Sequence, residues 1–222
     1  TRQEASIYQC LLTEGKVTGY EVAKQTGISR SNAYNSLASM TEKGAAYLVE
    51  EASTRKYVPV PLNEFCKNRI RKLEESGKWL QEHMPTEKAY VEGYITIEGA
   101  ENILNKIKNL LSQVDQRVYI SCTRNYLLLL IRELDTLMEE RKKVVIITDQ
   151  PATFHNAKVY FGENRGMQIG IIADSKYVLT GEYGEGSMNT CLYSGQKNFV
   201  ELYKTALANE IKLLSIREEN KD

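Results

Sequence analysis

The chain has 222 residues, of which 42% are hydrophobic and 26% charged, a composition typical of a globular protein rather than a disordered one. Its 29 basic residues equal its 29 acidic residues, which excludes a strongly basic chain that binds nucleic acid through net charge. The longest apolar run, at 126–131, is too short to cross a bilayer, and the first residues lack the pattern of a signal peptide. We therefore expect a cytoplasmic protein with no membrane partner.

The four cysteines, Cys10, Cys66, Cys122 and Cys191, lie far apart and form no C-x-x-C pair. Only two histidines could join them, so the spacing favours neither a zinc site nor a disulfide framework. Their apolar neighbours predict buried thiols without a chemical role. We expect no metal and no cofactor.

The first predicted element is an amphipathic helix over 2–14. Ala5, Tyr8, Leu11 and Leu12 recur at spacings of three and four, which predicts a buried stripe along one side of the helix. Gly15 ends it. A second helix begins after a cap near residue 18.

That cap is Thr18, and Glu21 three residues later completes a capping-box sequence. Gly27 ends the second helix after about two turns. A third helix follows over 30–42, with Ser29 as its predicted cap.

In the third predicted helix, Ala33, Leu37 and Met40 share one face, while polar side chains occupy the other. Two short helices joined through T-G-I-S and preceded by a third form the helix-turn-helix arrangement, whose later helix enters the major groove of DNA. The polar side chains can pair with base edges or phosphates, and no acid appears before Glu42. A solvated face on an ordinary three-helix unit is the alternative, and the helix alone does not decide between the two.

A hairpin is predicted directly after these helices. Residues 45–60 alternate apolar and polar positions on both sides of A-S-T, which is typical of two antiparallel strands. Arg55 and Lys56 lie just past the tip, where they would neutralise DNA phosphates as the wing of a winged helix does. The predicted DNA-binding residues are Thr18, Ser29, Arg30, Ser31, Asn32, Asn35, Ser36, Ser39, Arg55 and Lys56.

These segments together resemble a known family. The runs EASIYQCLL, GYEVAKQTGISRSNAYNSLASMTEKG and RKYVPVPLNEF are similar to the TrmB-type transcriptional regulators over about the first 65 residues. The resemblance implies double-stranded DNA as a partner, a homodimer, and control by a small-molecule effector.

A long helix is predicted at 61–86, between an N-terminal domain at 1–60 and a C-terminal domain at 88–222. Its apolar residues follow a heptad pattern that is interrupted by Gly77, which predicts a coiled-coil seam between two copies of the chain. Packing of this seam against the chain's own C-terminal domain is the alternative. The predicted dimerisation residues are Cys66, Ile70, Leu73, Leu80 and Met84.

From residue 90 onward, predicted strands alternate with helices, which indicates an α/β domain with a parallel or mixed sheet. The family resemblance implies half of a phospholipase D fold here, whose active half-site reads H-x-K-x4-D-x6-G-S. Asp174 and Gly181 fit the end of that motif, but Met167 and Ile169 occupy its His and Lys positions and Glu182 its Ser position. A thioether and an alkyl side chain cannot attack or hold a phosphate, so no catalytic residue is predicted.

Two other segments of the C-terminal domain resemble phosphate sites in part. His155 and Lys158 approach the H-x-K pattern, but their spacing would put them on different faces of a strand. The Gly-rich run at 181–187 contains two acids and lacks the Lys of a P-loop, so a hairpin loop is predicted instead.

The whole sequence thus predicts an α+β winged helix-turn-helix, a connecting heptad helix and an α/β C-terminal domain. The expected function is a dimeric DNA-binding transcriptional regulator, not an enzyme. Two alternatives stay open: a phosphodiesterase or phospholipase working through the C-terminal domain, and a winged helix used only for protein contacts.

Overall fold

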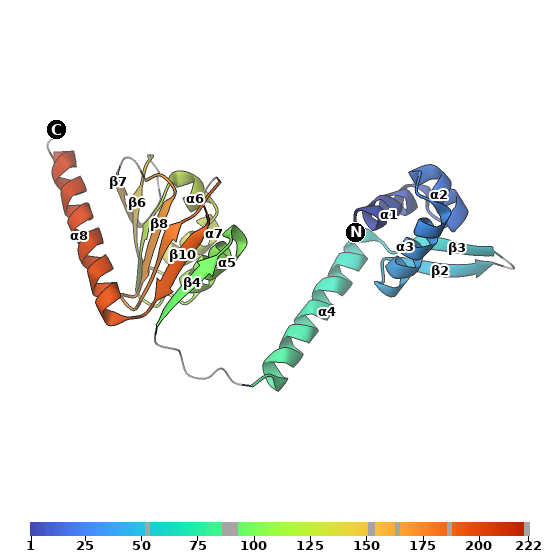
Figure 1. The fold of residues 1–222 in the computed structure, drawn as a ribbon, viewed down its shortest axis with the longest axis horizontal. Coiled ribbons are helices and arrows are strands. Elements are labelled where there is room, and N and C mark those ends of the chain that lie inside the picture. Colours follow the sequence, from blue (N-terminus) through green and yellow to red (C-terminus); the bar gives the residue numbers. More distant parts are fainter. Residues whose placement is uncertain (52–53, 86–92, 151–153, 163–164, 186–187, 220–222) are drawn as a thin grey trace. The chain divides into compact units, whose positions relative to one another are not determined.

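A computed structural model describes residues 1–51, 54–85, 93–150, 154–162, 165–185 and 188–219 (Figure 1). The chain divides into two compact units, Thr1–Glu87 and Lys88–Asp222, which are described separately below.

Three helices form the core of the N-terminal unit: α1 (Arg2–Glu14), α2 (Gly19–Thr26) and α3 (Arg30–Glu42). The predicted caps are confirmed. Thr18 and Glu21 form a reciprocal capping box at α2, and the backbone N–H of Asn32 donates to the Ser29 hydroxyl at α3. Gly15 and Gly27, both at positive φ, end the first two helices.

The buried stripe of α1 differs from the predicted one. Ile7 and Leu11 are fully buried and Tyr8 is half-buried, whereas Ala5 and Leu12 are exposed, so their predicted burial was wrong. The helix is rotated so that Ile7 and Leu11, four residues apart, meet the core together. The Tyr8 hydroxyl donates to the carbonyl of Val60 at 2.7 Å and ties α1 to the end of the hairpin.

The predicted hairpin is present as β2 (Ala46–Glu51) and β3 (Thr54–Pro59), paired antiparallel with Ala46 opposite Pro59. A short strand, β1 (Val17–Thr18), joins the outer edge of β3, which gives the order β1-β3-β2. After Pro61, α4 (Leu62–His83) extends over 22 residues. The N-terminal unit is therefore a winged helix-turn-helix followed by a long helix.

The C-terminal unit is built on a seven-stranded mixed sheet with the order β4-β10-β9-β8-β5-β6-β7. Strands β5, β6 and β7 are parallel, and the other pairs are antiparallel. The strand bounds are β4 (Tyr94–Glu98), β5 (Arg117–Ser121), β6 (Lys143–Thr148), β7 (Ala157–Phe161), β8 (Gln168–Ala173), β9 (Tyr177–Glu182) and β10 (Thr190–Ser194).

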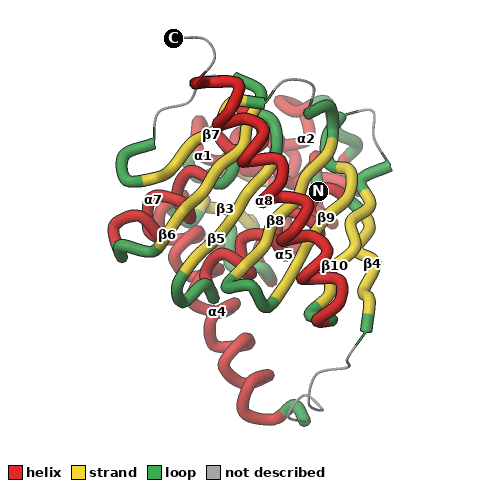
Figure 2. The backbone as a smooth tube through the Cα atoms, turned by 90° about the vertical axis from the view of Figure 1, so that its left-hand side faces the viewer, coloured by secondary structure: helices red, strands yellow, loops and turns green. Residues whose placement is uncertain are grey.

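Helices cover both faces of this sheet. The helices α5 (Ala100–Ser112), α6 (Arg124–Leu128) and α7 (Ile131–Glu139) lie on one face, and α8 (Lys197–Glu219) crosses the other (Figures 1 and 2). Side chains alternate along β8: Ile171 packs toward the first helix layer, and Ile172 packs toward α8. This three-layer arrangement confirms the predicted α/β class.

Two details of the predicted C-terminal elements were missed. Between the predicted strands at 117–122 and 143–149 the sequence predicts a single helix that ends at Arg141, whereas the structure breaks it at Leu129 and Leu130 into α6 and α7. Strand β7, which pairs parallel to β6, was not predicted, although Tyr160 within it is buried.

Asp174 lies in the tight turn between β8 and β9, at φ 49°. Its carboxylate accepts the backbone N–H groups of Asp115, Gln116 and Arg117 at 2.7, 2.8 and 2.9 Å. Burial alone would raise the pKa of this carboxyl, but the three N–H donors outweigh burial and lower it. Asp174 therefore joins the β8–β9 turn to the start of β5.

No helix in the described part of the chain is long and apolar enough to cross a membrane. Within the same residues, no group of three or more His, Cys, Asp or Glu side chains is placed to hold a metal ion.

We predict that Asp174→Asn destabilises the C-terminal unit by about 2 kcal/mol at neutral pH, because three backbone N–H groups lose a charged acceptor. A carboxyl with a lowered folded-state pKa stabilises the fold above its unfolded pKa of about 4, and that stabilisation disappears as the pH falls through the folded-state value. Urea denaturation should thus separate the variant from wild type at pH 7 and bring the two together in acid. Asp115→Asn, which removes an exposed neighbouring carboxylate, is the control. Equal losses in both variants would contradict the assigned role.

Candidate functional site

Helix α3 presents a polar face whose direction is fixed by burial of the opposite side. Ala33, Leu37 and Met40 are buried at 0 to 2% exposure. The helical period then directs Ser31 and Asn35 most squarely outward. Both are exposed, as predicted, and Ala38 lies between them and Glu42 on the same face. The side chains at the centre of this surface are therefore small, and one of them, Asn35, carries an amide group.

One flank of α3 is occupied by contacts within the protein. The Ser39 hydroxyl donates to the Glu4 carboxylate at 2.8 Å, and the Lys43 ammonium approaches the same oxygen at 2.5 Å. Ser36 is half-buried on this side, whereas Asn32 is exposed. Ser39, one of the predicted DNA-binding residues, is half-buried, and a carboxylate from α1 engages its side chain; a DNA contact by Ser39 stays a prediction.

Glu4 joins α1 to the end of α3. The Lys43 ammonium contributes most to lowering the pKa of the Glu4 carboxyl well below its usual range, and the Ser39 hydroxyl adds to the effect. The side chain of Glu4 is 13% exposed, so the pair is partly shielded from water. It holds the orientation of α3 relative to α1.

Two tyrosines that the sequence interpretation missed border the other flank of α3. Tyr20 belongs to α2, and Tyr34 belongs to α3 itself. The Arg30 guanidinium lies 4.4 Å from the centre of the Tyr20 ring, which orients this cation at the start of α3. Tyr34 is 43% exposed, and its ring lies against Gly19, where an added Cβ would be 2.5 Å from the ring. The spacing of Tyr20 and Tyr34 around the predicted turn could have drawn attention to them, since both exposed rings border the polar face.

Thr18 acts first as a cap. Its hydroxyl accepts from the backbone N–H of Glu21 at 3.3 Å, and its own N–H donates to the Glu21 carboxylate at 2.7 Å. It lies at the entry to α2 and also pairs with Lys56 across β1 and β3. A DNA contact by Thr18 stays a prediction.

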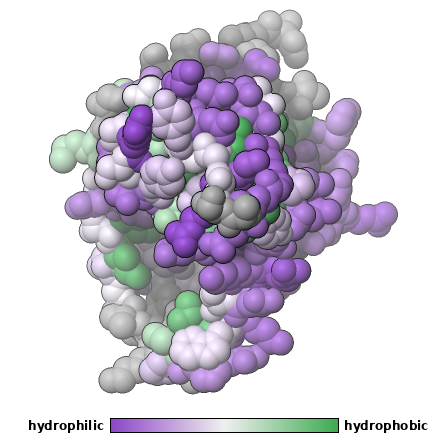
Figure 3. Space-filling model, turned by 90° about the vertical axis from the view of Figure 1, so that its right-hand side faces the viewer, coloured by the Kyte–Doolittle hydropathy of each residue, from purple (hydrophilic) through white to green (hydrophobic). Residues whose placement is uncertain are grey.

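The basic residues of the wing are paired with acids on the same hairpin. Arg55 lies 3.1 Å from Glu50, and Lys56 lies 3.0 Å from Glu51. Lys16 also contacts Glu51. The exposed surface on this side of the N-terminal unit is mostly hydrophilic (Figure 3), and its wing is close to charge balance.

Helix α4 has no buried residue among those described. The predicted seam is exposed along its length: Ile70 by 56%, Leu73 by 66%, Leu80 by 48% and Met84 by 60%. Trp79 beside the seam is 57% exposed and stacks on His83. The N-terminal unit leaves this apolar stripe without a covering partner of its own.

The thiols fall into two groups. Cys122 and Cys191 are buried as predicted, and burial raises the pKa of Cys122 to about 12 and of Cys191 to about 11. Both therefore stay protonated at neutral pH, which does not suit a nucleophile. Cys66 is exposed and Cys10 is half-buried, so their predicted burial was wrong. Cys66 lies on the uncovered face of α4.

The residues compared with the phospholipase D motif in the sequence lie on and beside β8. Ile169, at the position of the catalytic Lys, is 2% exposed within the core, and Met167, at the position of the His, is 37% exposed. His155 is an exposed loop residue before β7. The run at 181–187 begins at the end of β9, before the antiparallel β10, and its residues 186–187 lie outside the described part.

Residues 1–63 match the family model described as sugar-specific transcriptional regulator TrmB. A curated relative, the uncharacterized protein YrhO of Bacillus subtilis (strain 168), is 32% identical over 164 residues, which cover 72% of this chain. The chain spans 59% of the length of that relative.

Three solved structures resemble the fold at low identity. The archaeal chromatin protein TrmBL2, titled as showing a novel mode of DNA binding, has a TM-score of 0.48 and 18% identity over 96% of this chain and 93% of its own. NucT from Helicobacter pylori has a TM-score of 0.44 and 16% identity over 54% of this chain and 97% of its own. Phosphatidylserine synthase from Haemophilus influenzae Rd KW20 has a TM-score of 0.35 and 14% identity over 72% of this chain and 54% of its own.

Proposed function

We propose that this chain, whose N-terminal domain is of the TrmB type, is a sequence-specific DNA-binding transcriptional regulator that acts as a homodimer under the control of a small-molecule effector. The observation that carries the proposal is the outward face of α3 within a winged helix. Ser31 and Asn35 stand at its centre, and no acid precedes Glu42 on the helix.

Asn35 is the residue we assign to base recognition. An amide can donate to and accept from adenine in the major groove, whereas serine hydroxyls serve bases or phosphates. Arg30, held over Tyr20 at the start of α3, is placed for a phosphate or a guanine. Asn32 and Ser29 complete the polar surface at the N-terminal end of this helix.

The wing supports the proposal in a modified form. Arg55 and Lys56 each lie beside a glutamate, so a DNA phosphate must replace Glu50 or Glu51 as their partner. Exposed ion pairs contribute little to stability, and the exchange costs little. The nearby glutamates still repel the phosphate backbone. We infer that the wing adds a modest affinity that depends on salt, while α3 supplies the sequence preference.

The exposed stripe of α4 supports the homodimer. A second copy of the stripe would cover side chains that are now half exposed to water, and burial of one Leu or Ile stabilises an interface by about 1.5 to 3 kcal/mol. A symmetric pair of these helices would also place two winged domains on two half-sites of DNA.

The C-terminal unit fits a regulatory role. A core isoleucine fills the position of the catalytic Lys on β8, and Asp174, the acid that survives from the motif, binds three backbone N–H groups. Neither side chain is available to a phosphodiester. We infer that this unit senses a ligand rather than cleaving one.

We predict that Asn35→Ala reduces the preference for the DNA upstream of the chain's own gene over a scrambled duplex. Loss of one bidentate base contact is worth about 1 to 3 kcal/mol, or roughly 5- to 150-fold. Fluorescence anisotropy with both duplexes measures the ratio. Arg55→Gln is the control, and it should weaken binding to both duplexes alike. If wild type shows no preference, or if Asn35→Ala leaves it intact, sequence recognition by α3 is wrong.

Opposite effects are expected from the two sides of the Arg55–Glu50 pair. Glu50→Gln should strengthen DNA binding because it removes a repulsive charge from the wing. Arg55→Gln should weaken binding and lower the slope of log K against log salt by about 1, the value for one phosphate contact. Titrations at several salt concentrations test both. Equal weakening by the two variants would mean that the ion pair serves the fold of the wing and not DNA.

Leu73→Glu should dissociate the homodimer, raising its dissociation constant at least roughly tenfold, because a charge replaces an apolar side chain at the centre of the seam. Sedimentation equilibrium measures the constant. Arg71→Glu, two residues away on the opposite side of α4, introduces the same carboxylate with an even larger change of net charge and should leave the dimer intact. A wild-type chain that stays monomeric at all concentrations would refute the α4 interface.

A further inference from the structure

A hollow of about 330 Å³ opens between α8 and the sheet face formed by β5, β6 and β7. Its floor is apolar: Val145, Tyr160 and Ile172 are buried at 1 to 6% exposure. Leu207 and Ile211 close it from the side of α8. The volume lies within the range of small-molecule sites.

Cations from four separate elements line this hollow: Arg117 of β5, Lys143 of β6, Lys158 of β7 and Lys204 of α8. Arg117 and Lys143 are direct neighbours across the parallel β5–β6 pair. Like charges in such positions repel each other and destabilise a sheet. No acidic side chain is among the described residues that line the hollow.

Two acids close in sequence to lining residues have partners of their own. Asp174 directs its carboxylate to three backbone N–H groups at the start of β5, and Glu201 pairs with Lys204 at 2.8 Å on the surface of α8. The repulsion between Arg117 and Lys143 is therefore not balanced by a carboxylate inside the hollow. A bound anion would balance it.

Aromatic rings give the hollow a second property. The Lys143 ammonium lies 5.9 Å from the centre of the Tyr119 ring, and the Lys158 ammonium lies 4.9 Å from that of Tyr160. Lys143 of β6 thus lies beside a ring of the adjacent strand β5, and Lys158 lies beside a ring of its own strand, β7. This arrangement suits a ligand with a charged end and a flat or apolar body.

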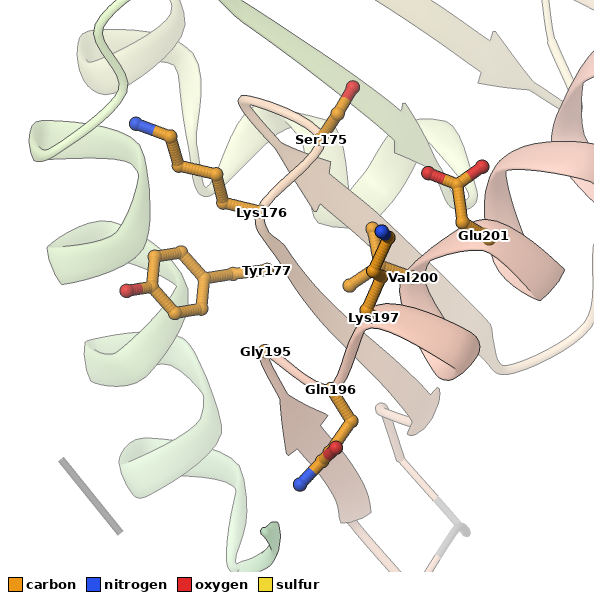
Figure 4. A pocket seen from close by; sticks show the side chains of 8 residues that line it. All are labelled: Ser175, Lys176, Tyr177, Gly195, Gln196, Lys197, Val200 and Glu201. Atoms are coloured by element: carbon orange, nitrogen blue, oxygen red, sulfur yellow. The ribbon is translucent and has the colours of Figure 1, made fainter. Parts of the chain in front are cut away.

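A neighbouring hollow of about 560 Å³, which shares Ser175 with the first, also contains two lysines and a tyrosine, but their arrangement differs. Figure 4 shows that its side chains diverge: Lys176 and Tyr177 point toward α5, while Gln196 and Glu201 point in other directions. One of them is an acid. No set of groups converges there on a single ligand.

We propose that the cationic hollow between α8 and β5–β7 binds a small organic phosphate, with the phosphate near Arg117 and Lys143 and the body of the ligand against Tyr119 and Tyr160. The hollow lies at the end of β8 away from Met167, the position of the catalytic His, and it borders Asp174 only through Arg117 and Ser175. This site would supply the proposed effector control. Binding of the ligand does not depend on the proposed function, but its effect on DNA binding does.

Phenyl phosphate is the probe, and calorimetric titration of the full chain without DNA is the measurement. Phenyl phosphate should bind more tightly than inorganic phosphate, which lacks the ring. Phenol, which lacks the charge, should not bind. The double variant Arg117→Gln/Lys143→Gln should bind phenyl phosphate at least tenfold more weakly than wild type does. Arg132→Gln/Lys212→Gln removes the same charge from exposed positions outside the hollow and should bind as wild type does.

Thermal unfolding provides a second readout that separates ligand binding from damage to the fold. Without ligand, Arg117→Gln/Lys143→Gln should unfold at a temperature equal to or above that of wild type, because a repulsive pair is removed. Phenyl phosphate should raise the unfolding temperature of wild type and leave that of the variant unchanged.

Three results would overturn the proposal: no binding of phenyl phosphate at millimolar concentration, equal weakening by both double variants, or displacement of the probe by scrambled duplex DNA, which would make the cluster a DNA contact. Because the titration contains no operator, its failure leaves the DNA-binding proposal standing. Failure of operator binding likewise leaves the ligand site standing.

Discussion

Burial of Ala33, Leu37 and Met40 against α1 and α2 determines what α3 can present to a partner. Once these three side chains are inside, the helical period directs Asn35 and its neighbours outward. The Glu4 contact to Ser39 and Lys43 then holds one flank of α3, and the stacking of Arg30 on Tyr20 holds the other. The candidate DNA surface is therefore preorganised by packing rather than by a high positive charge.

The distribution of charge differs between the two units. On the wing, Arg55 and Lys56 are matched by glutamates on the adjacent strand, in keeping with a chain whose net charge is zero. Under α8, Arg117 and Lys143 meet without an acid between them. A balanced surface suits a partner chosen by hydrogen bonds, whereas an unbalanced hollow suits an anion that supplies the missing charge.

Local features were predictable from the sequence, whereas features that join distant residues were not. The Thr18 and Ser29 caps and the hairpin at 46–59 depend on neighbours a few residues apart, and all are confirmed. The Ser39–Glu4 contact spans 35 residues. The cations at 117, 143, 158 and 204 meet only because three parallel strands begin side by side beneath α8, and no spacing in the chain indicates that.

In the proposed homodimer, α4 pairs two copies of the chain so that their α3 helices face successive turns of DNA. The direct test is the distance between spin labels at Ala38→Cys in the homodimer, with Cys10 and Cys66 replaced by serine, measured by pulsed electron paramagnetic resonance. A single narrow distribution near about 34 Å, one helical turn of DNA, is the expected result. A monomer without dipolar coupling, or a dimer whose labels lie at a different separation with operator bound, would contradict the account.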